Sequence, residues 1–124
     1  MYELIIETKF SAAHQLRGYE GRCERLHGHN WKVEVSVQAG ALNNIGLAVD
    51  FKEIKDATNE FLALLEHSFV NEVFPFTEIN PSSENMAKWL YDSLASKLNT
   101  DALCVSRVTV WESDTARASY FEQP

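Results

Sequence analysis

The apolar residues of this chain change their spacing at Asp50. Upstream, over residues 31–38, valines alternate with polar residues, which is the period-two pattern of a strand with one solvated face. Downstream, over residues 51–65, apolar residues recur at helical spacing after a capping-box start formed by Asp50 and Glu53. The chain must therefore combine strands and helices that each bury one face.

A second helix start lies in residues 80–85, which read NPSSEN. Ser82 or Ser83 can cap the first turn, and Glu84 places a negative charge where the helix dipole favours one. The next apolar residues form one stripe on a helix that should end near Leu98: Met86, Leu90, Leu94 and Leu98. Two helices are thus expected in the middle of the chain.

Three further segments have the composition or alternation of strands: residues 2–13, 104–112 and 118–122. The order ββααββ predicts an α+β fold in which both helices cover one face of a four-stranded antiparallel sheet. With 124 residues, no repeat and no linker, we expect one domain over 1–124. The exposed sheet edges indicate that strands continue into neighbouring subunits of a homo-oligomer.

Charge and composition narrow the possible partners. The net charge of −7 opposes binding to nucleic acid or to an anionic membrane, and no apolar run approaches the roughly 20 residues of a membrane span. The start, MYELIIETKF, lacks the pattern of a signal peptide, and there are only two cysteines, so we expect a cytoplasmic protein. Arg17, Arg22 and Arg25 could still attract a small anionic substrate, or they could form a solvated rim.

Three of the four histidines, His14, His27 and His29, lie within sixteen residues. In an extended segment His27 and His29 point to the same side, and a hairpin would bring His14 alongside them. Three neutral imidazoles suit Zn²⁺ and leave a fourth position for water or substrate. This spacing predicts a zinc site of the catalytic type.

Other interpretations of these residues stay open at this stage. The histidines could cap a turn and lie on a strand surface, or Cys23 could close a structural site with three histidines. Cys23 lies between Arg22 and Arg25, whose charges favour a thiolate that can act as a base or a nucleophile. Cys104, beside Val105, is expected to be a small buried apolar residue.

The runs FSAAH, CERLHGH, AVDF, NPSSEN and the final WES resemble, in order and spacing, the 6-pyruvoyl-tetrahydropterin synthase family. The match covers nearly the whole chain. The three-residue gap between Cys23 and His27 is similar to the bacterial branch of this family, the 6-carboxy-5,6,7,8-tetrahydropterin synthases of queuosine and deazapurine biosynthesis. The resemblance implies a tunnel-fold subunit that trimerises into a twelve-stranded barrel, often pairs into a hexamer and forms its active sites between subunits.

The resemblance also implies roles for individual residues. Zinc would be held by His14, His27 and His29, and Cys23 would be the catalytic thiol. His67 would complete the proton-transfer machinery with Glu66, which stands where the family usually has Asp. Glu112 would anchor the pterin, and its two carboxylate oxygens do suit the parallel N–H donors of an aminopyrimidinone.

The implied function is a zinc-dependent lyase reaction on a reduced pterin. It would convert 7,8-dihydroneopterin triphosphate to 6-carboxy-5,6,7,8-tetrahydropterin, acetaldehyde and triphosphate. Within the family, the alternative is triphosphate elimination to 6-pyruvoyl tetrahydropterin, and a related tunnel-fold enzyme could act as a dihydroneopterin aldolase. A zinc-stabilised binding protein without turnover is the alternative from another class.

Overall fold

The computed structural model describes residues 1–20 and 24–123. Its elements follow the predicted order ββααββ, with one additional 3₁₀ turn, and the strands form an antiparallel sheet in the order β1-β2-β3-β4. The bounds are β1 Tyr2–His14, β2 His27–Ala39, α1 Phe51–Leu62, η1 Val70–Glu72, α2 Ser83–Leu98, β3 Leu103–Ser113 and β4 Ala116–Tyr120. The predicted fold class is confirmed.

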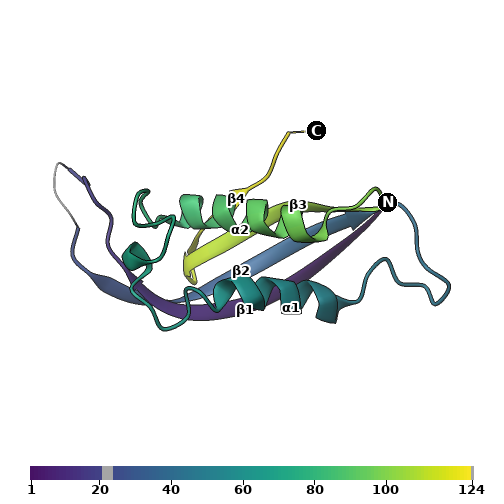
Figure 1. Cartoon of the computed structure of the whole chain (residues 1–124), viewed down its shortest axis with the longest axis horizontal. Coiled ribbons are helices and arrows are strands. Elements are labelled where there is room, and N and C mark those ends of the chain that lie inside the picture. Colours follow the sequence, from purple (N-terminus) through teal and green to yellow (C-terminus); the bar gives the residue numbers. More distant parts are fainter. Residues whose placement is uncertain (21–23, 124) are drawn as a thin grey trace.

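Both helices lie along the same face of the sheet (Figure 1). Helix α1 packs against β1, and α2 packs against β3 and β4. Each helix begins where the capping residues predict: the Asp50 carboxylate accepts a hydrogen bond from Lys52 N–H, and the Ser82 hydroxyl accepts one from Asn85 N–H. The stripe predicted for α2 is its buried face, whereas on α1 Ile54 and Leu62 are buried and Phe51 is exposed.

Helix α1 ends at Leu62, three residues before the predicted Leu65. The N–H groups of Leu64 and Leu65 bond to carbonyls only three residues back, which tightens the chain into a turn. The turn carries residues 66–69 to the outer edge of β1, where His67 N–H donates to Ser11 O at 2.6 Å. The bond between residue 67 and β1 joins segments far apart in the sequence, so the helical spacing of apolar residues could not predict it.

Strands β1 and β2 pair along their whole length, from Tyr2 with Ala39 to His14 with His27. Because β1 supplies partners for residues 27–30 as well, β2 begins four residues before the predicted Trp31. The core under the helices includes fully buried Trp31, Val33 and Val35, each contributing about 1.5–3 kcal/mol of transfer free energy. The histidine segment therefore continues directly from a fully buried part of the sheet.

One prediction about the strands is wrong. Cys104 is exposed, and the neighbouring Val105 faces the core instead. Strand alternation allows only one of two adjacent residues to point inward, and the larger apolar side chain gains more from burial.

No described helix is long and apolar enough to span a membrane.

Candidate metal centre

Three histidines converge where β1 ends and β2 begins. The register pairs His14 with His27 and Ala12 with His29, so all three imidazoles project from the helix-covered face of the sheet. Their rings meet edge to face, with centroids 4.5 Å apart for His14 and His27 and 4.6 Å apart for His27 and His29. Trp31 lies beside them, 4.8 Å from the His14 ring and 5.1 Å from the His29 ring. The apolar core thus forms one wall of the histidine cluster.

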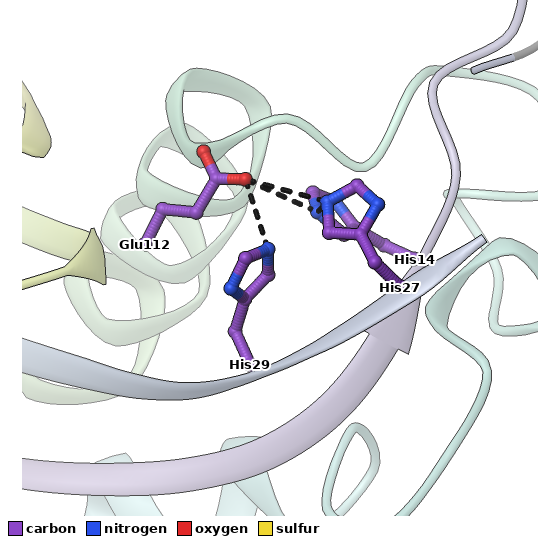
Figure 2. A group of neighbouring side chains, drawn as sticks. All are labelled: His14, His27, His29 and Glu112. Atoms are coloured by element: carbon purple, nitrogen blue, oxygen red, sulfur yellow. Dashed lines mark hydrogen bonds and ion pairs between the residues drawn. The ribbon is translucent and has the colours of Figure 1, made fainter. Parts of the chain in front are cut away.

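Glu112 reaches the same point from β3 (Figure 2). Its Oε1 atom lies 3.1 Å from His29 Nε2, 3.4 Å from His14 Nε2 and 3.6 Å from His27 Nε2. The four potential ligand atoms lie within 4.8 Å of one another, so this cluster could bind a metal ion.

The place of Glu112 beside the histidines was not predicted. Alternation along residues 104–112 places Val108, Val110 and Glu112 on one face of a strand, but the sequence does not identify the partner strand. Because Val33 pairs with Val110 in the antiparallel ladder, the end of β3 lies across from the start of β2. Knowledge of this register would have located Glu112 at the histidines.

Main-chain carbonyls set the orientation of two of the rings. His14 Nδ1 lies 2.8 Å from Pro81 O, and His27 Nδ1 lies 2.7 Å from Arg25 O. A carbonyl oxygen only accepts hydrogen bonds, so each Nδ1 must carry the proton, and each neutral ring then presents a bare Nε2 lone pair. Both lone pairs point into the cluster, as metal ligation requires.

His29 is the third ring and is also suited to ligation. Burial lowers its pKa below 6.5, and the neighbouring rings of His27 and His14 lower it further, while the attraction of the Glu112 carboxylate partly opposes this shift. The neutral form, which is the form that binds metals, is therefore favoured. Its buried Nε2 has no well-aligned hydrogen-bond partner among the described residues, although Glu112 Oε1 is 3.1 Å away.

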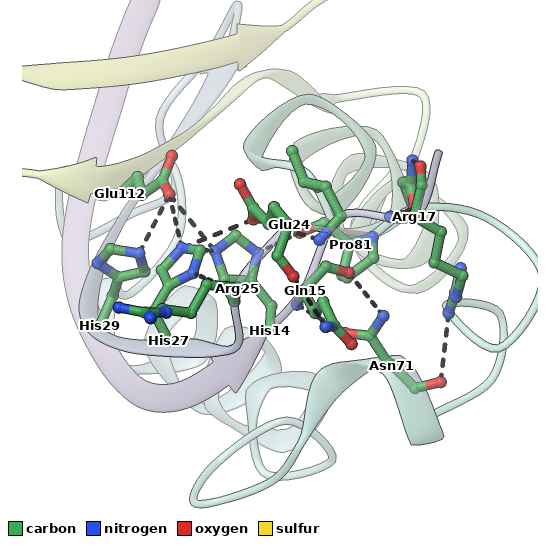
Figure 3. A network of polar contacts seen from close by, with 12 residues as sticks. His14, Gln15, Arg17, Glu24, Arg25, His27, His29, Asn71, Pro81 and Glu112 are labelled. Atoms are coloured by element: carbon green, nitrogen blue, oxygen red, sulfur yellow. Dashed lines mark hydrogen bonds and ion pairs between the residues drawn. The ribbon is translucent and has the colours of Figure 1, made fainter. Parts of the chain in front are cut away.

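Glu24 is a polar neighbour of the site that sequence reasoning missed. Its Oε1 lies 3.7 Å from His27 Nε2 and accepts a hydrogen bond from Leu16 N–H at 3.2 Å. Its main-chain carbonyl accepts a hydrogen bond from Gln15 Nε2 at 2.8 Å (Figure 3). Glu24 thereby joins the residues after His14 to the residues before His27. Its position next to Cys23 in the CERLHGH run was the only available signal.

Glu66 and His67 lie together at the outer edge of β1. Glu66 Oε2 accepts a hydrogen bond from Ser11 N–H at 3.1 Å, and Glu66 Oε1 lies 3.1 Å from His67 Nε2. Glu66 has a longer side chain than the Asp that is usual in the family. Its carboxylate bonds to the edge of β1 and also contacts the His67 imidazole. His67 has a positive φ of 54°, and its side chain is 80% exposed.

The structure does not bring His67 into the histidine cluster. His67 lines a shallow hollow at the edge of β1 with Ser11, Ala12, Ala13, Gly28, His29, Asn30 and Ser68. Among the described residues, the ligand atoms that meet at one point belong to His14, His27, His29 and Glu112, and His67 is not one of these four. Within one chain, the predicted proton-transfer pair therefore lies apart from the metal cluster.

The arginines near the site have different surroundings. The guanidinium group of Arg17 donates hydrogen bonds to the main-chain carbonyls of Asn71, Phe76 and Ile79. Because the Arg17 guanidinium group already hydrogen-bonds to the chain between residues 71 and 79, it is a poor candidate for the predicted anion-attracting cluster. Arg25 is exposed, whereas Arg22 and Cys23 lie outside the described residues. The catalytic role of Cys23 stays a prediction.

A sequence profile described as 6-pyruvoyl tetrahydropterin synthase matches residues 3–123. The chain is 38% identical over 109 residues to a protein of Archaeoglobus fulgidus provisionally named 6-carboxy-5,6,7,8-tetrahydropterin synthase, covering 88% of this chain and 86% of the relative. It is 31% identical over 126 residues to the Synechocystis sp. 6-carboxy-5,6,7,8-tetrahydropterin synthase, covering 98% and 94%. It is 30% identical over 111 residues to the Pyrococcus furiosus dihydroneopterin monophosphate aldolase, covering 90% of each chain.

The fold is also similar to that of solved structures. The Caenorhabditis elegans 6-pyruvoyl tetrahydropterin synthase superimposes with a TM-score of 0.81, covering 98% of this chain and 96% of that chain. At 20% identity this likeness concerns the fold.

Proposed function

Since the chain belongs to the 6-pyruvoyl tetrahydropterin synthase family, we propose that it is a zinc-dependent 6-carboxy-5,6,7,8-tetrahydropterin synthase. Its reaction converts 7,8-dihydroneopterin triphosphate and water to the 6-carboxy product, acetaldehyde and triphosphate, as a lyase of cytoplasmic queuosine and deazapurine biosynthesis. Several relatives that cover most of the chain carry the name of this enzyme.

The zinc proposal rests on two unprotonated ring nitrogens that face each other, His14 Nε2 and His27 Nε2. His14 Nε2 and His27 Nε2 lie 2.9 Å apart, and both Nδ1 protons are already donated to carbonyls. Two lone pairs at this distance repel each other unless a cation or a shared proton lies between them. A divalent cation ligated by His14, His27 and His29 removes this repulsion, so the donor set fits the proposed zinc.

Bound zinc would supply Lewis acidity that makes a C–H beside a coordinated substrate oxygen more acidic. The other roles belong to side chains of the chain itself. The Cys23 thiolate is the base that removes the proton, and the Glu112 carboxylate accepts hydrogen bonds from the pterin N–H groups. His67, oriented by Glu66, relays the proton.

The proton relay requires an active site shared between subunits. His67 is exposed at the edge of β1 and is not among the described residues whose ligand atoms meet in the histidine cluster of its own chain. It therefore serves the site of a neighbouring subunit, which agrees with the proposed assembly into a trimer or hexamer.

Product analysis tests this proposal directly. Zinc-loaded protein is incubated with 7,8-dihydroneopterin triphosphate, and the products are identified by mass spectrometry. Acetaldehyde and the 6-carboxy product should appear in equal amounts. Accumulation of 6-pyruvoyl tetrahydropterin without acetaldehyde would overturn the assignment in favour of the other family reaction.

A second candidate function is the aldolase, which the Pyrococcus furiosus relative favours. An aldolase would act on dihydroneopterin or its monophosphate without losing triphosphate. Comparing triphosphate, monophosphate and unphosphorylated substrates in the same assay separates the two activities. The absence of turnover with all three substrates would leave a zinc-stabilised binding protein.

A further inference from the structure

We infer that Asn80 is a positioning residue of the metal centre, because it holds the main-chain segment whose carbonyl orients His14. The inference rests on the proposed metal site and adds a residue whose side-chain amide hydrogen-bonds with Arg17. The residues involved are the segment after β1, residues 15–17, and the loop that precedes α2, residues 73–82.

Two asparagine side chains hold residues 15–17: Asn71, which lies in η1, and Asn80, which lies in the loop before α2. Asn71 Oδ1 accepts from Gln15 N–H at 2.9 Å, and Asn71 Nδ2 donates to Gln15 O at 2.7 Å (Figure 3). Asn80 makes the same pair of bonds with Arg17, at 2.7 Å to its N–H and 2.8 Å to its carbonyl. Each amide thereby pairs both the main-chain N–H and the main-chain carbonyl of one residue beyond the end of β1.

Asn80 is also held from the side of helix α2. Asn85, in the first turn of α2, donates from its Nδ2 to Asn80 O at 2.9 Å. The main-chain N–H of Asn85 in turn bonds to the N-cap hydroxyl of Ser82 at 3.1 Å. Residues 80–82 are therefore fixed between the exit of β1 and the start of α2.

The residue between these anchors is Pro81, whose carbonyl accepts the Nδ1 proton of His14 at 2.8 Å. Pro81 is buried, and the His14 side chain is only 2% exposed. This bond selects the tautomer and ring angle that direct His14 Nε2 toward the cluster. Loss of the Asn80 side-chain amide would release one end of residues 80–82, which carry the Pro81 carbonyl. His14 would then be less well oriented, so the affinity for the metal should fall.

The test compares Asn80→Ala with Asn43→Ala. Asn43 accepts two main-chain N–H bonds, from Ile45 and Leu47, both at 3.0 Å. It lies in the loop between β2 and α1, at the other end of the sheet from residues 15–17 (Figure 1). Zinc dissociation constants are measured by competition with a chromophoric chelator, the spectrum of bound Co²⁺ reports ligand geometry, and urea unfolding is followed without metal.

Removing a group that orients a metal-bound histidine commonly costs about 10–100-fold in metal affinity. We expect Asn80→Ala to weaken zinc binding at least about tenfold and to change the Co²⁺ spectrum, with Asn43→Ala within about twofold of the unaltered chain. Equal zinc affinities for the two variants would overturn the inference, whatever their stabilities. If Asn80→Ala does not fold, Asn85→Ala, which removes only the bond to Asn80 O, must weaken zinc binding by itself, and an unchanged affinity overturns the inference.

The proposed function fails separately. If neither the unaltered chain nor any variant binds zinc, or if His14→Ala binds it as tightly as the unaltered chain, the metal site itself is wrong. If the unaltered chain binds zinc through His14 and Asn80→Ala binds it equally well, only the positioning role is wrong.

Discussion

The Nε2 atoms of His14 and His27 lie 2.9 Å apart, although the Nδ1 proton of each ring is donated to a main-chain carbonyl. Two neutral imidazoles held in this way have no proton to share between them. Their facing Nε2 lone pairs repel each other, and a cation ligated by both would remove this repulsion. Facing lone pairs are also what ligation of one metal ion by both rings requires.

Metal removal should destabilise the fold. A cation that binds the native state and not the unfolded state adds RT ln(1 + [L]/Kd) to the free energy of unfolding, about 2.7 kcal/mol at a hundredfold excess over Kd. Differential scanning calorimetry with zinc and with a chelator should give a higher melting temperature with zinc. His27→Ala should abolish this difference, and a persisting zinc effect in that variant would show that the ion binds elsewhere.

Replacing Glu112 separates its two possible roles. If Glu112 anchors the pterin, Glu112→Gln should raise KM by tenfold or more, about 1.4 kcal/mol, since one carboxylate acceptor becomes an N–H donor facing the N–H groups of the pterin. Zinc content, measured by atomic absorption, should stay at the level of the unaltered chain. A loss of zinc in this variant would instead identify Glu112 as a metal ligand, which its 3.1 Å contact with His29 Nε2 would permit.

Cys23→Ala addresses the catalytic thiol. Loss of a general base commonly lowers turnover by about 10²–10⁴-fold. We expect this loss in kcat with unchanged zinc content and melting temperature. Cys104→Ala is the matched control, because Cys104 is an exposed thiol at the start of β3, and this change should leave kcat unaltered. Simultaneous loss of zinc and stability in Cys23→Ala would show that Cys23 is a structural ligand.

Mixing inactive variants tests whether the site is shared between subunits. His67→Ala should lose turnover while keeping its stability, since the imidazole is 80% exposed. When Cys23→Ala and His67→Ala chains are dissociated and reassembled together, about a quarter of the shared sites combine an intact Cys23 with an intact His67. Activity should return on mixing. Continued inactivity of verified mixed oligomers would indicate that both residues act within one chain.

The sequence by itself determined the parts of this protein that follow from local geometry. The starts of both helices at Asp50 and Ser82, the valine face of β2 and the shared side of His27 and His29 were predictable. Backbone periods of 3.6 and 2 residues place these side chains regardless of the rest of the chain. The same periods predicted the order of elements, ββααββ, which the structure confirms.

Only the tertiary structure decided which distant segments meet at the cluster. The register of β3 on β2 brings Glu112 to the histidines, and the loop before α2 brings the Pro81 carbonyl to His14, 67 positions away along the chain. The edge of β1 ends helix α1 early and holds Glu66. Such contacts depend on strand register and packing between segments far apart in sequence, and no local pattern of residues encodes them.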